Sequence, residues 1–145
     1  MGSNVLVKLV DTREELAGAA AVRRRVFVEE QGVPLQEEYD AYDAVAVHAV
    51  ALVDGQVIAT GRLFTDEGGE AHIGRMAVDE KWRRVGIGGR VLRALEDEAR
   101  RHNIQRAVLH AQTYVRQFYA VHGYTAKGPL FMEAGIEHIA MEKAL

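Results

Sequence analysis

The sequence predicts an α/β fold in which a mixed sheet is covered by helices on both faces. Three β-rich runs separated by short turns, within residues 47–78, indicate an antiparallel meander. An amphipathic helix, a strand of buried type, a short helix and a final strand follow them. Strand–helix–strand connections lay their helices on the faces of a sheet, so the two halves together predict the mixed arrangement.

The chain starts with a short β-rich run, at residues 5–10, followed by a helix. Thr12 and Glu15 have the spacing of a capping box, which favours a helix beginning there. Gly32 and Pro34 are expected to end this helix.

A β-hairpin is the clearest local signal. Asp54 and Gly55 lie between the β-rich runs 47–53 and 56–64, and this dipeptide favours a type I′ turn. A second turn at residues 67–70 leads into a third antiparallel strand at 71–78.

The second half alternates helices and strands. Residues 89–103 have the period of an amphipathic helix, residues 105–112 form a strand, and residues 114–123 form a short helix. The tail contains one or two strands, of which 137–143 is the stronger. One side of the first of these helices is apolar, with Val91, Leu92, Leu95 and Ala99.

Composition bounds the class of protein. The 145 residues, 48% of them hydrophobic, suit a single domain, which we expect to span 4–145. A formal net charge of −3 argues against nucleic-acid binding, and the absence of cysteine excludes thiol catalysis, disulfides and cysteine-ligated zinc. No apolar run reaches the length of a membrane span and no signal peptide is evident, so we expect a cytoplasmic protein without a membrane partner.

Residues 83–90, "RRVGIGGR", place three glycines between a strand and a helix. The segment lacks the Lys-Ser or Lys-Thr of a Walker A loop, and valine stands where a dinucleotide fingerprint needs its third glycine. Backbone N–H groups, the positive end of the helix dipole and the arginines could still hold a pyrophosphate. A flexible turn with solvated arginines is the alternative.

The spacing Arg83-x-x-Gly86-x-Gly88 is similar to the [QR]xxGx[GA] signature of the GNAT superfamily of N-acetyltransferases. The segment "QFYAVHGY" resembles a second motif of that family, with Tyr119 at its tyrosine, and Gln112 stands where the family often has asparagine. "RRRVFVEEQGVP", "DAVAVHAV" and "FMEAGIEHIAM" resemble the ElaA-like branch. The resemblance covers nearly the whole chain.

The resemblance implies a mixed, mostly antiparallel central sheet with a splayed strand pair at the cofactor site. It implies acetyl-CoA as acyl donor, its pyrophosphate on the backbone of residues 84–89 and its pantetheine arm along 76–78. A main-chain N–H in the gap could stabilise the oxyanion. The cofactor-binding residues so implied are Met76, Ala77, Val78, Arg83, Arg84, Val85, Gly86, Ile87, Gly88, Gly89 and Gln112.

Tyr119 is the catalytic residue that the resemblance implies. Acetylation of an amine releases a CoA thiolate, and a positioned phenol can protonate it. The competing interpretation is an ordinary aromatic residue with its ring in the core.

The acceptor amine must lose a proton before it attacks, and the sequence leaves the base open. Glu30, near the end of the first helix, is the candidate base, and His48, Glu133 and His138 are candidate residues of the acceptor pocket. No metal site is expected, because no HExxH or similar spacing occurs. The wider set of base candidates is Glu29, Glu30, His48, His72, His110 and His138.

The reaction expected is direct transfer from acetyl-CoA to a primary amine of a small molecule or a protein. A non-catalytic acyl-CoA-binding module is the main alternative, and an acyl-homoserine-lactone synthase is a third. The sequence identifies neither the acceptor nor the oligomeric state, and it leaves a homodimer open. An acidic segment is interpreted as a solvated loop, or alternatively as a guide for cationic amines, and contains Glu37, Glu38, Asp40 and Asp43.

Overall fold

One seven-stranded sheet, in the order β1-β2-β3-β4-β5-β7-β6, runs through the computed structural model, which describes residues 4–145. Neighbouring strands are antiparallel except β4 and β5, which are parallel. The mixed, mostly antiparallel sheet predicted from the sequence is therefore confirmed. The strands are β1 Val5–Leu9, β2 Val47–Val53, β3 Gln56–Thr65, β4 Ala71–Val78, β5 Arg106–Gln112, β6 Thr125–Glu133 and β7 Ile136–Ala144.

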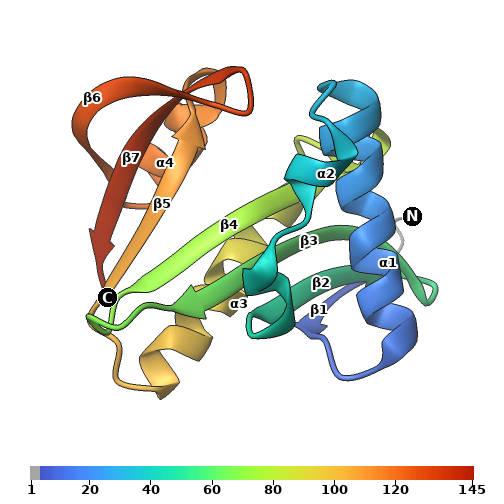
Figure 1. Cartoon of the computed structure of the whole chain (residues 1–145). Helices are drawn as coiled ribbons and strands as arrows, with labels where there is room; N and C mark the ends of the chain where they lie inside the picture. The colour runs from blue at the N-terminus through green and yellow to red at the C-terminus, as the bar shows by residue number, and fades with distance from the viewer. Residues whose placement is uncertain (1–3) are drawn as a thin grey trace.

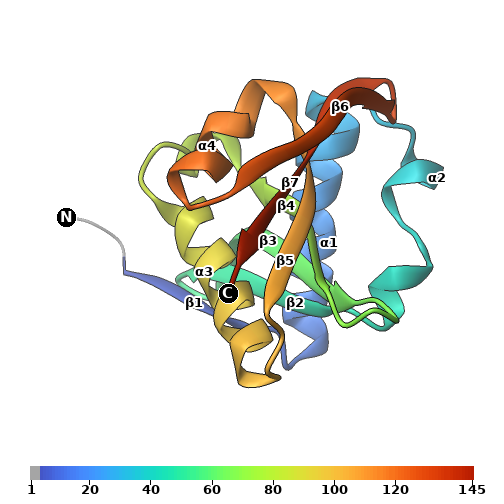
Figure 2. The same ribbon diagram turned by 90° about the vertical axis from the view of Figure 1, so that its left-hand side faces the viewer.

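Helices lie on both faces of this sheet, as the sequence predicts (Figures 1 and 2). Within residues 4–145 no helix combines the length and apolar character needed to cross a membrane. The α-helices are α1 Arg13–Arg23, α2 Leu35–Glu38, α3 Ile87–Arg101 and α4 Arg116–Val121. The shorter helical turns and the π-helix are η1 Arg24–Glu30, η2 Ala41–Ala44, η3 Glu80–Trp82 and η4 Thr113–Val115.

The alternation of β2 shows how the two faces are filled. Ala49 and Ala51 belong to the core under α3, whereas Val50 and Leu52 belong to the core under α1. Successive side chains of a strand point to opposite faces, so a strand with apolar residues at every position is buried on both. α1 and α3 consequently sandwich the middle of the sheet.

The sheet opens between β4 and β5. Only two residue pairs join these strands, Ala71 with Ala107 and His72 with Val108. Beyond them the strands diverge, so β5, β7 and β6 lean away from the other four strands (Figure 1). This is the splayed pair expected from the sequence.

The structure confirms the turn at Asp54 and Gly55 and the cap at Thr12, both of which depend on neighbouring residues alone. Asp54 and Gly55 have φ of 51° and 79°, as a type I′ turn requires. The Thr12 hydroxyl accepts a hydrogen bond from the Glu15 N–H at 3.1 Å, which caps α1. The Glu15 carboxylate accepts from the N–H of Asp11 rather than from that of Thr12, one residue beyond the expected box.

Two segments differ from expectation. The first helix does not stay α-helical to its end but continues as the π-helix η1, and residues 35–44 contain two short helices instead of an irregular loop. The tail forms a full hairpin of β6 and β7. A bulge in β6 and the positive φ of Gly128, 82°, explain why β6 has the weaker sequence signal.

Candidate active site

A cleft of about 1110 Å³ occupies the gap where β4 and β5 diverge. It extends from the start of α3, past β4 and α4, to the hairpin of β6 and β7. Of the site residues expected from the sequence, Val85 and His48 do not line it. The expected residues that do are Glu30, Met76, Ala77, Val78, Arg83, Arg84, Gly86, Ile87, Gly88, Gly89, Gln112, Tyr119, Glu133 and His138.

The glycine loop turns sharply into α3. Arg84 and Gly86 both have left-handed backbones, with φ of 67° and 84°, and the first bond of the helix runs from the Arg90 N–H to the Gly86 carbonyl at 3.3 Å. The N–H groups of the helix's first turn have no partners within the helix and carry its positive dipole end. They are therefore available to an anion at this end of the cleft.

Gly89 of this loop is needed for close packing. A Cβ there would lie 2.7 Å from the ring of His122, whereas a Cβ on Gly88 would make an ordinary contact with the ring of Phe118 at 3.4 Å. The loop is thus pressed against α4, which carries Tyr119.

β4 has a bulge halfway along the cleft. Thr60 and Arg62 of β3 pair with Ala77 and Gly74 of β4, so β4 contains one more residue than β3 over this stretch. Arg75 has a φ of 52°, a conformation that side-chain-bearing residues rarely adopt. A bulge interrupts the ladder and leaves main-chain groups without a strand partner, here beside the gap.

Tyr119 is buried but reaches the cleft. The residue is 8% exposed, and its ring packs edge-on against Phe118 and Tyr124. In the described part of the chain its hydroxyl has no hydrogen-bond partner. Burial raises the pKa of Tyr119, so the phenol keeps its proton. A protonated phenol at a cleft wall can serve as a proton donor.

The comparisons with known proteins agree with this geometry. A family model described as an acetyltransferase (GNAT) domain matches residues 11–145. The chain belongs to the GNAT family. Members of this family transfer acyl groups from acyl-CoA, and the chain is accordingly a GNAT acyltransferase.

Relatives cover nearly the whole of this GNAT chain. The uncharacterized N-acetyltransferase YjcF of Bacillus subtilis is 34% identical over 93% of this chain and 96% of its own. The structure of an acyl-CoA N-acyltransferase from Pseudomonas aeruginosa is 31% identical, with a TM-score of 0.84 over 99% of this chain and 100% of that one. Escherichia coli ElaA is 22% identical with a TM-score of 0.85, over 97% and 99% of the two chains, which shows the shared fold.

A bridge of amides, which the sequence did not predict, crosses the cleft of this GNAT protein. The Gln112 amide at the end of β5 donates to the Gln31 side-chain oxygen at 2.8 Å, and the Gln31 amide donates to the Tyr114 hydroxyl at 2.9 Å. Gln31 caps the end of η1, so the bridge joins the first helix to the far half of the sheet. No local pattern marks such a contact between residues 81 positions apart.

Arginines from three elements hold the acidic segment that follows η1. Glu38 is 2% exposed, so the solvated loop expected from the sequence is wrong at this residue. Arg23 donates to Glu38 at 2.8 Å and to Asp43 at 2.6 Å, while Arg62 donates to Asp43 at 2.9 Å and to both oxygens of Asp40. The segment is thus a neutralised wall of the cleft rather than a free negative surface.

The same wall contains an unsatisfied carboxylate oxygen. Glu38 Oε2 has no partner among residues 4–145, whereas Oε1 accepts from Arg23. Burial raises the pKa of Glu38, against the opposing effect of Arg23. Arg75 donates to the Glu38 carbonyl oxygen at 3.0 Å and lies over this wall.

Histidines form the opposite wall. Nδ1 of His110 lies 2.9 Å from the Glu133 carboxylate, whose other oxygen lies 3.7 Å from Nε2 of His138. The hydrogen bond to Glu133 raises the pKa of His110. His48, by contrast, is buried under η2 with Nε2 3.0 Å from the Asp43 carbonyl oxygen, so it supports the acidic segment and does not face the cleft.

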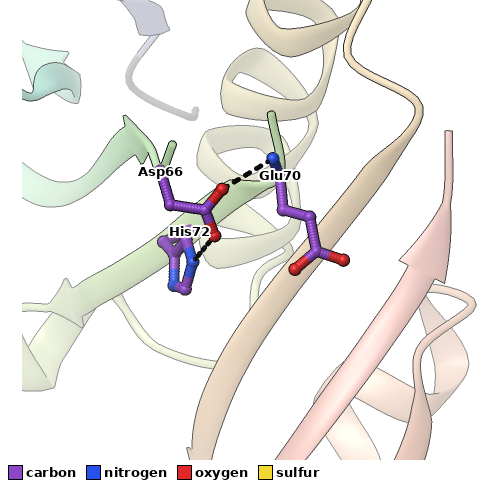
Figure 3. A group of neighbouring side chains, drawn as sticks. All are labelled: Asp66, Glu70 and His72. Atoms are coloured by element: carbon purple, nitrogen blue, oxygen red, sulfur yellow. Dashed lines mark hydrogen bonds and ion pairs between the residues drawn. The ribbon is translucent and has the colours of Figure 1, made fainter. Parts of the chain in front are cut away.

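One further group of side chains has the proximity of metal ligands: Asp66, Glu70 and His72, at the turn between β3 and β4 (Figure 3). Asp66 accepts from the Glu70 N–H at 3.0 Å and lies 2.6 Å from Nε2 of His72. The Glu70 carboxylate has an oxygen within 4.8 Å of the ligand atoms of the other two, and it lies 3.5 Å from Arg106. Closure of the turn and pairing between strands account for these contacts.

Proposed function

We propose that this GNAT protein transfers the acetyl group of acetyl-CoA to a primary amine by direct attack within a ternary complex. The observation that carries the proposal is that one cleft contains the glycine loop, the diverging strands β4 and β5, and Tyr119. A similar structure, a streptothricin acetyltransferase from Bacillus anthracis, was solved in complex with acetyl coenzyme A; it is 20% identical with a TM-score of 0.61, over 69% of this chain and 62% of that one.

The residues at the start of α3 suit a pyrophosphate. The backbone N–H groups of residues 84–89 would bind it, aided by the exposed guanidinium of Arg84. Arg83 would act indirectly, because its guanidinium already donates to the Val78 carbonyl oxygen at 2.8 Å and to Glu30.

The pantetheine arm would run along Met76, Ala77 and Val78. Met76 and Val78 pack against the core under α3, and Ala77 belongs to the core under α1, so only main-chain groups face the arm. A main-chain N–H beside the bulge would stabilise the oxyanion, and Gln112 would contact the same substrate.

Tyr119 would complete the reaction by giving its proton to the CoA thiolate. Its neutral phenol is stabilised by burial, so the hydroxyl carries a proton at neutral pH when the thiolate forms. The chain has no cysteine, so no cysteine acyl-enzyme intervenes and the amine attacks the thioester itself.

An amine-panel assay tests this function. Thiol release from acetyl-CoA is measured with each amine, for the wild type and for Tyr119→Phe, alongside CoA affinity. We expect amine-dependent turnover, a kcat about 10²-fold lower in Tyr119→Phe, and equal CoA affinity. Tight CoA binding without turnover on any amine would instead indicate a non-catalytic acyl-CoA-binding module.

A further inference from the structure

The two ring nitrogens of His138 are in different environments. Nδ1 lies 2.7 Å from the carbonyl oxygen of Ile136, and a carbonyl oxygen can only accept a hydrogen bond. The proton of the neutral ring is therefore on Nδ1, and Nε2 carries a free lone pair. The ring of Phe131 stacks on the imidazole with centroids 5.9 Å apart, which fixes its plane.

The lone pair of Nε2 is open to the cleft. His138 lines the cleft although the residue is only 6% exposed. Nε2 makes no hydrogen bond within residues 4–145. In the same residues, the fully buried side-chain atoms that lack a hydrogen-bond partner are Glu38 Oε2 and Arg62 Nε. Nε2 is not one of them, so it is not fully buried. An atom that is neither bonded nor enclosed must face the open space beside it.

His138 stands beside the wide end of the gap. It pairs directly with Gln112, the last residue of β5, in the ladder of β5 and β7. Directly paired residues share one face of a sheet. Because β4 and β5 pair only at their other ends, this position borders the widest part of the cleft.

Most other basic groups of the cleft are engaged or lie elsewhere, and Glu37 of α2, which also lines the cleft, is exposed to solvent. Glu30 accepts two hydrogen bonds from an arginine, and the free oxygen of Glu38 is enclosed by protein. His72 and His110 each have a ring nitrogen within 2.9 Å of a carboxylate oxygen. His122 lies against the glycine loop, at the end of the cleft where α3 begins.

We propose that His138 Nε2 is the general base that removes a proton from the acceptor ammonium. This rests on the proposed function. The ammonium R–NH3⁺ gives one proton to Nε2 and becomes R–NH2. The amine nitrogen then bonds to the thioester carbon, and the carbon–sulfur bond breaks. The nitrogen then loses a second proton, and Tyr119 gives one proton to the thiolate, so these two transfers cancel. The products are the amide, CoA–SH and one released proton.

Glu133 is a positioning residue for this base. Its carboxylate lies 3.7 Å from Nε2 and stabilises the imidazolium that proton abstraction creates. Its other oxygen contacts His110, whose side chain is 53% exposed. The order His138, Glu133, His110 gives the released proton a route from the cleft to water. The hydrogen bond from His110 lowers the pKa of Glu133 against the effect of burial, and the charges of His110, His138 and Arg75 lower it further. Besides Arg75, the opposite wall contains the charged side chains of Glu38, Asp40 and Arg62.

The variant His138→Asn tests the base. Asparagine keeps an N–H near the position of Nδ1, and with it the bond to Ile136, but has no basic atom. We expect kcat to fall about 10²-fold with the KM for acetyl-CoA unchanged, and added imidazole to restore part of the activity. His102→Asn is the matched control, because His102 lies at the end of α3 outside the cleft.

A second measurement does not depend on turnover. Nitrogen-15 NMR of the ligand-free protein should show His138 as the Nδ1–H tautomer at neutral pH, and an Nε2–H tautomer would overturn the inference. An unchanged kcat in His138→Asn would overturn it while leaving the acetyltransferase function intact. A wild type that acetylates no amine would overturn the proposed function, and the base with it.

A split between kcat and KM separates the role of Glu133 from a structural one. Glu133→Gln keeps the shape of the side chain but removes the negative charge that stabilises the imidazolium. We expect kcat to fall about tenfold with the KM for acetyl-CoA unchanged. An unchanged kcat in Glu133→Gln would show that this carboxylate does not act on the base.

Discussion

Arg83 donates hydrogen bonds to both carboxylate oxygens of Glu30, at 2.7 and 3.0 Å, and a third to the carbonyl oxygen of Val78 at 2.8 Å. One guanidinium thus ties the end of η1 to the glycine loop and to the last residue of β4. Charge-assisted bidentate pairs of this kind fix geometry as well as charge. Glu30 therefore holds the glycine-loop end of the cleft in place.

Glu30→Gln should accordingly affect binding more than chemistry. The amide keeps one acceptor for Arg83 but loses the second, so the loop is less firmly held. We expect the KM for acetyl-CoA to rise a few-fold and kcat to stay within about twofold, measured by steady-state kinetics. A fall in kcat of about 10²-fold with an unchanged KM would restore Glu30 as the general base.

The fold could be predicted from the sequence because its signals are local or periodic. The Asp54-Gly55 turn and the apolar face of α3 depend only on neighbouring residues, and both have the predicted form. The left-handed backbone of Gly86 also depends on a local property, its own missing side chain. The glycines alone leave a plain turn as an alternative, and the resemblance to the GNAT signature supplies the pyrophosphate interpretation.

The wall of the cleft that the acidic segment forms could not be predicted in this way. Its partners meet only in the folded chain: Arg23 and Glu38 are 15 residues apart, and Arg62 and Asp40 are 22 apart. An acidic segment with no cationic partner close by in the sequence predicts a solvated loop. Only the three-dimensional pairing with arginines shows that Glu38 is buried.

Gly86→Asp should abolish acetyl-CoA binding while the protein still folds. The new carboxylate would lie at the helix start and repel the pyrophosphate. The left-handed backbone at position 86 costs a residue with a side chain about 1–2 kcal/mol of stability. Isothermal titration with acetyl-CoA and denaturant unfolding measure the two effects.

Gly55→Asp is the matched control for this strain. Gly55 has a similar φ, 79° against 84° for Gly86, and neither glycine has an atom within 4 Å of an added Cβ. Gly55 lies in the β2–β3 turn, outside the cleft. We expect a similar loss of stability in both variants and a loss of binding only in Gly86→Asp. Full affinity in Gly86→Asp would make the loop a plain turn.

We expect the stability that Asp43 contributes to the folded protein to be lost in acid. Burial acts to raise the pKa of Asp43, but hydrogen bonds from Arg23, Asp40 and Arg62 outweigh it and lower that pKa below its ordinary value of 3.8. A carboxyl whose pKa is lower in the folded state stabilises it at neutral pH. This contribution is lost as the pH falls through 3.8 and then through the lower folded-state value.

Asp43→Asn removes that contribution and leaves two buried arginines short of a partner. We expect the free energy of unfolding at neutral pH to fall by about 3 kcal/mol and to depend less on pH below 4. Urea unfolding across the acidic range measures both. Asp97→Asn is the control, since the Asp97 side chain is 63% exposed and pairs with Arg100. Parallel stability curves for the wild type and Asp43→Asn would contradict the prediction.

The amide bridge allows the two roles of Gln112 to be separated. Gln31→Ala removes the hydrogen bond to Gln112 and also the one to Tyr114. If Gln112 only holds Gln31, adding Gln112→Ala to Gln31→Ala should therefore lower kcat/KM no further. If Gln112 also contacts acetyl-CoA, as proposed, the double variant should lose about 1 kcal/mol more than Gln31→Ala, roughly fivefold in kcat/KM. We expect the second outcome, with the excess in the KM for acetyl-CoA. Equal losses in Gln31→Ala and the double variant would assign Gln112 to the bridge alone.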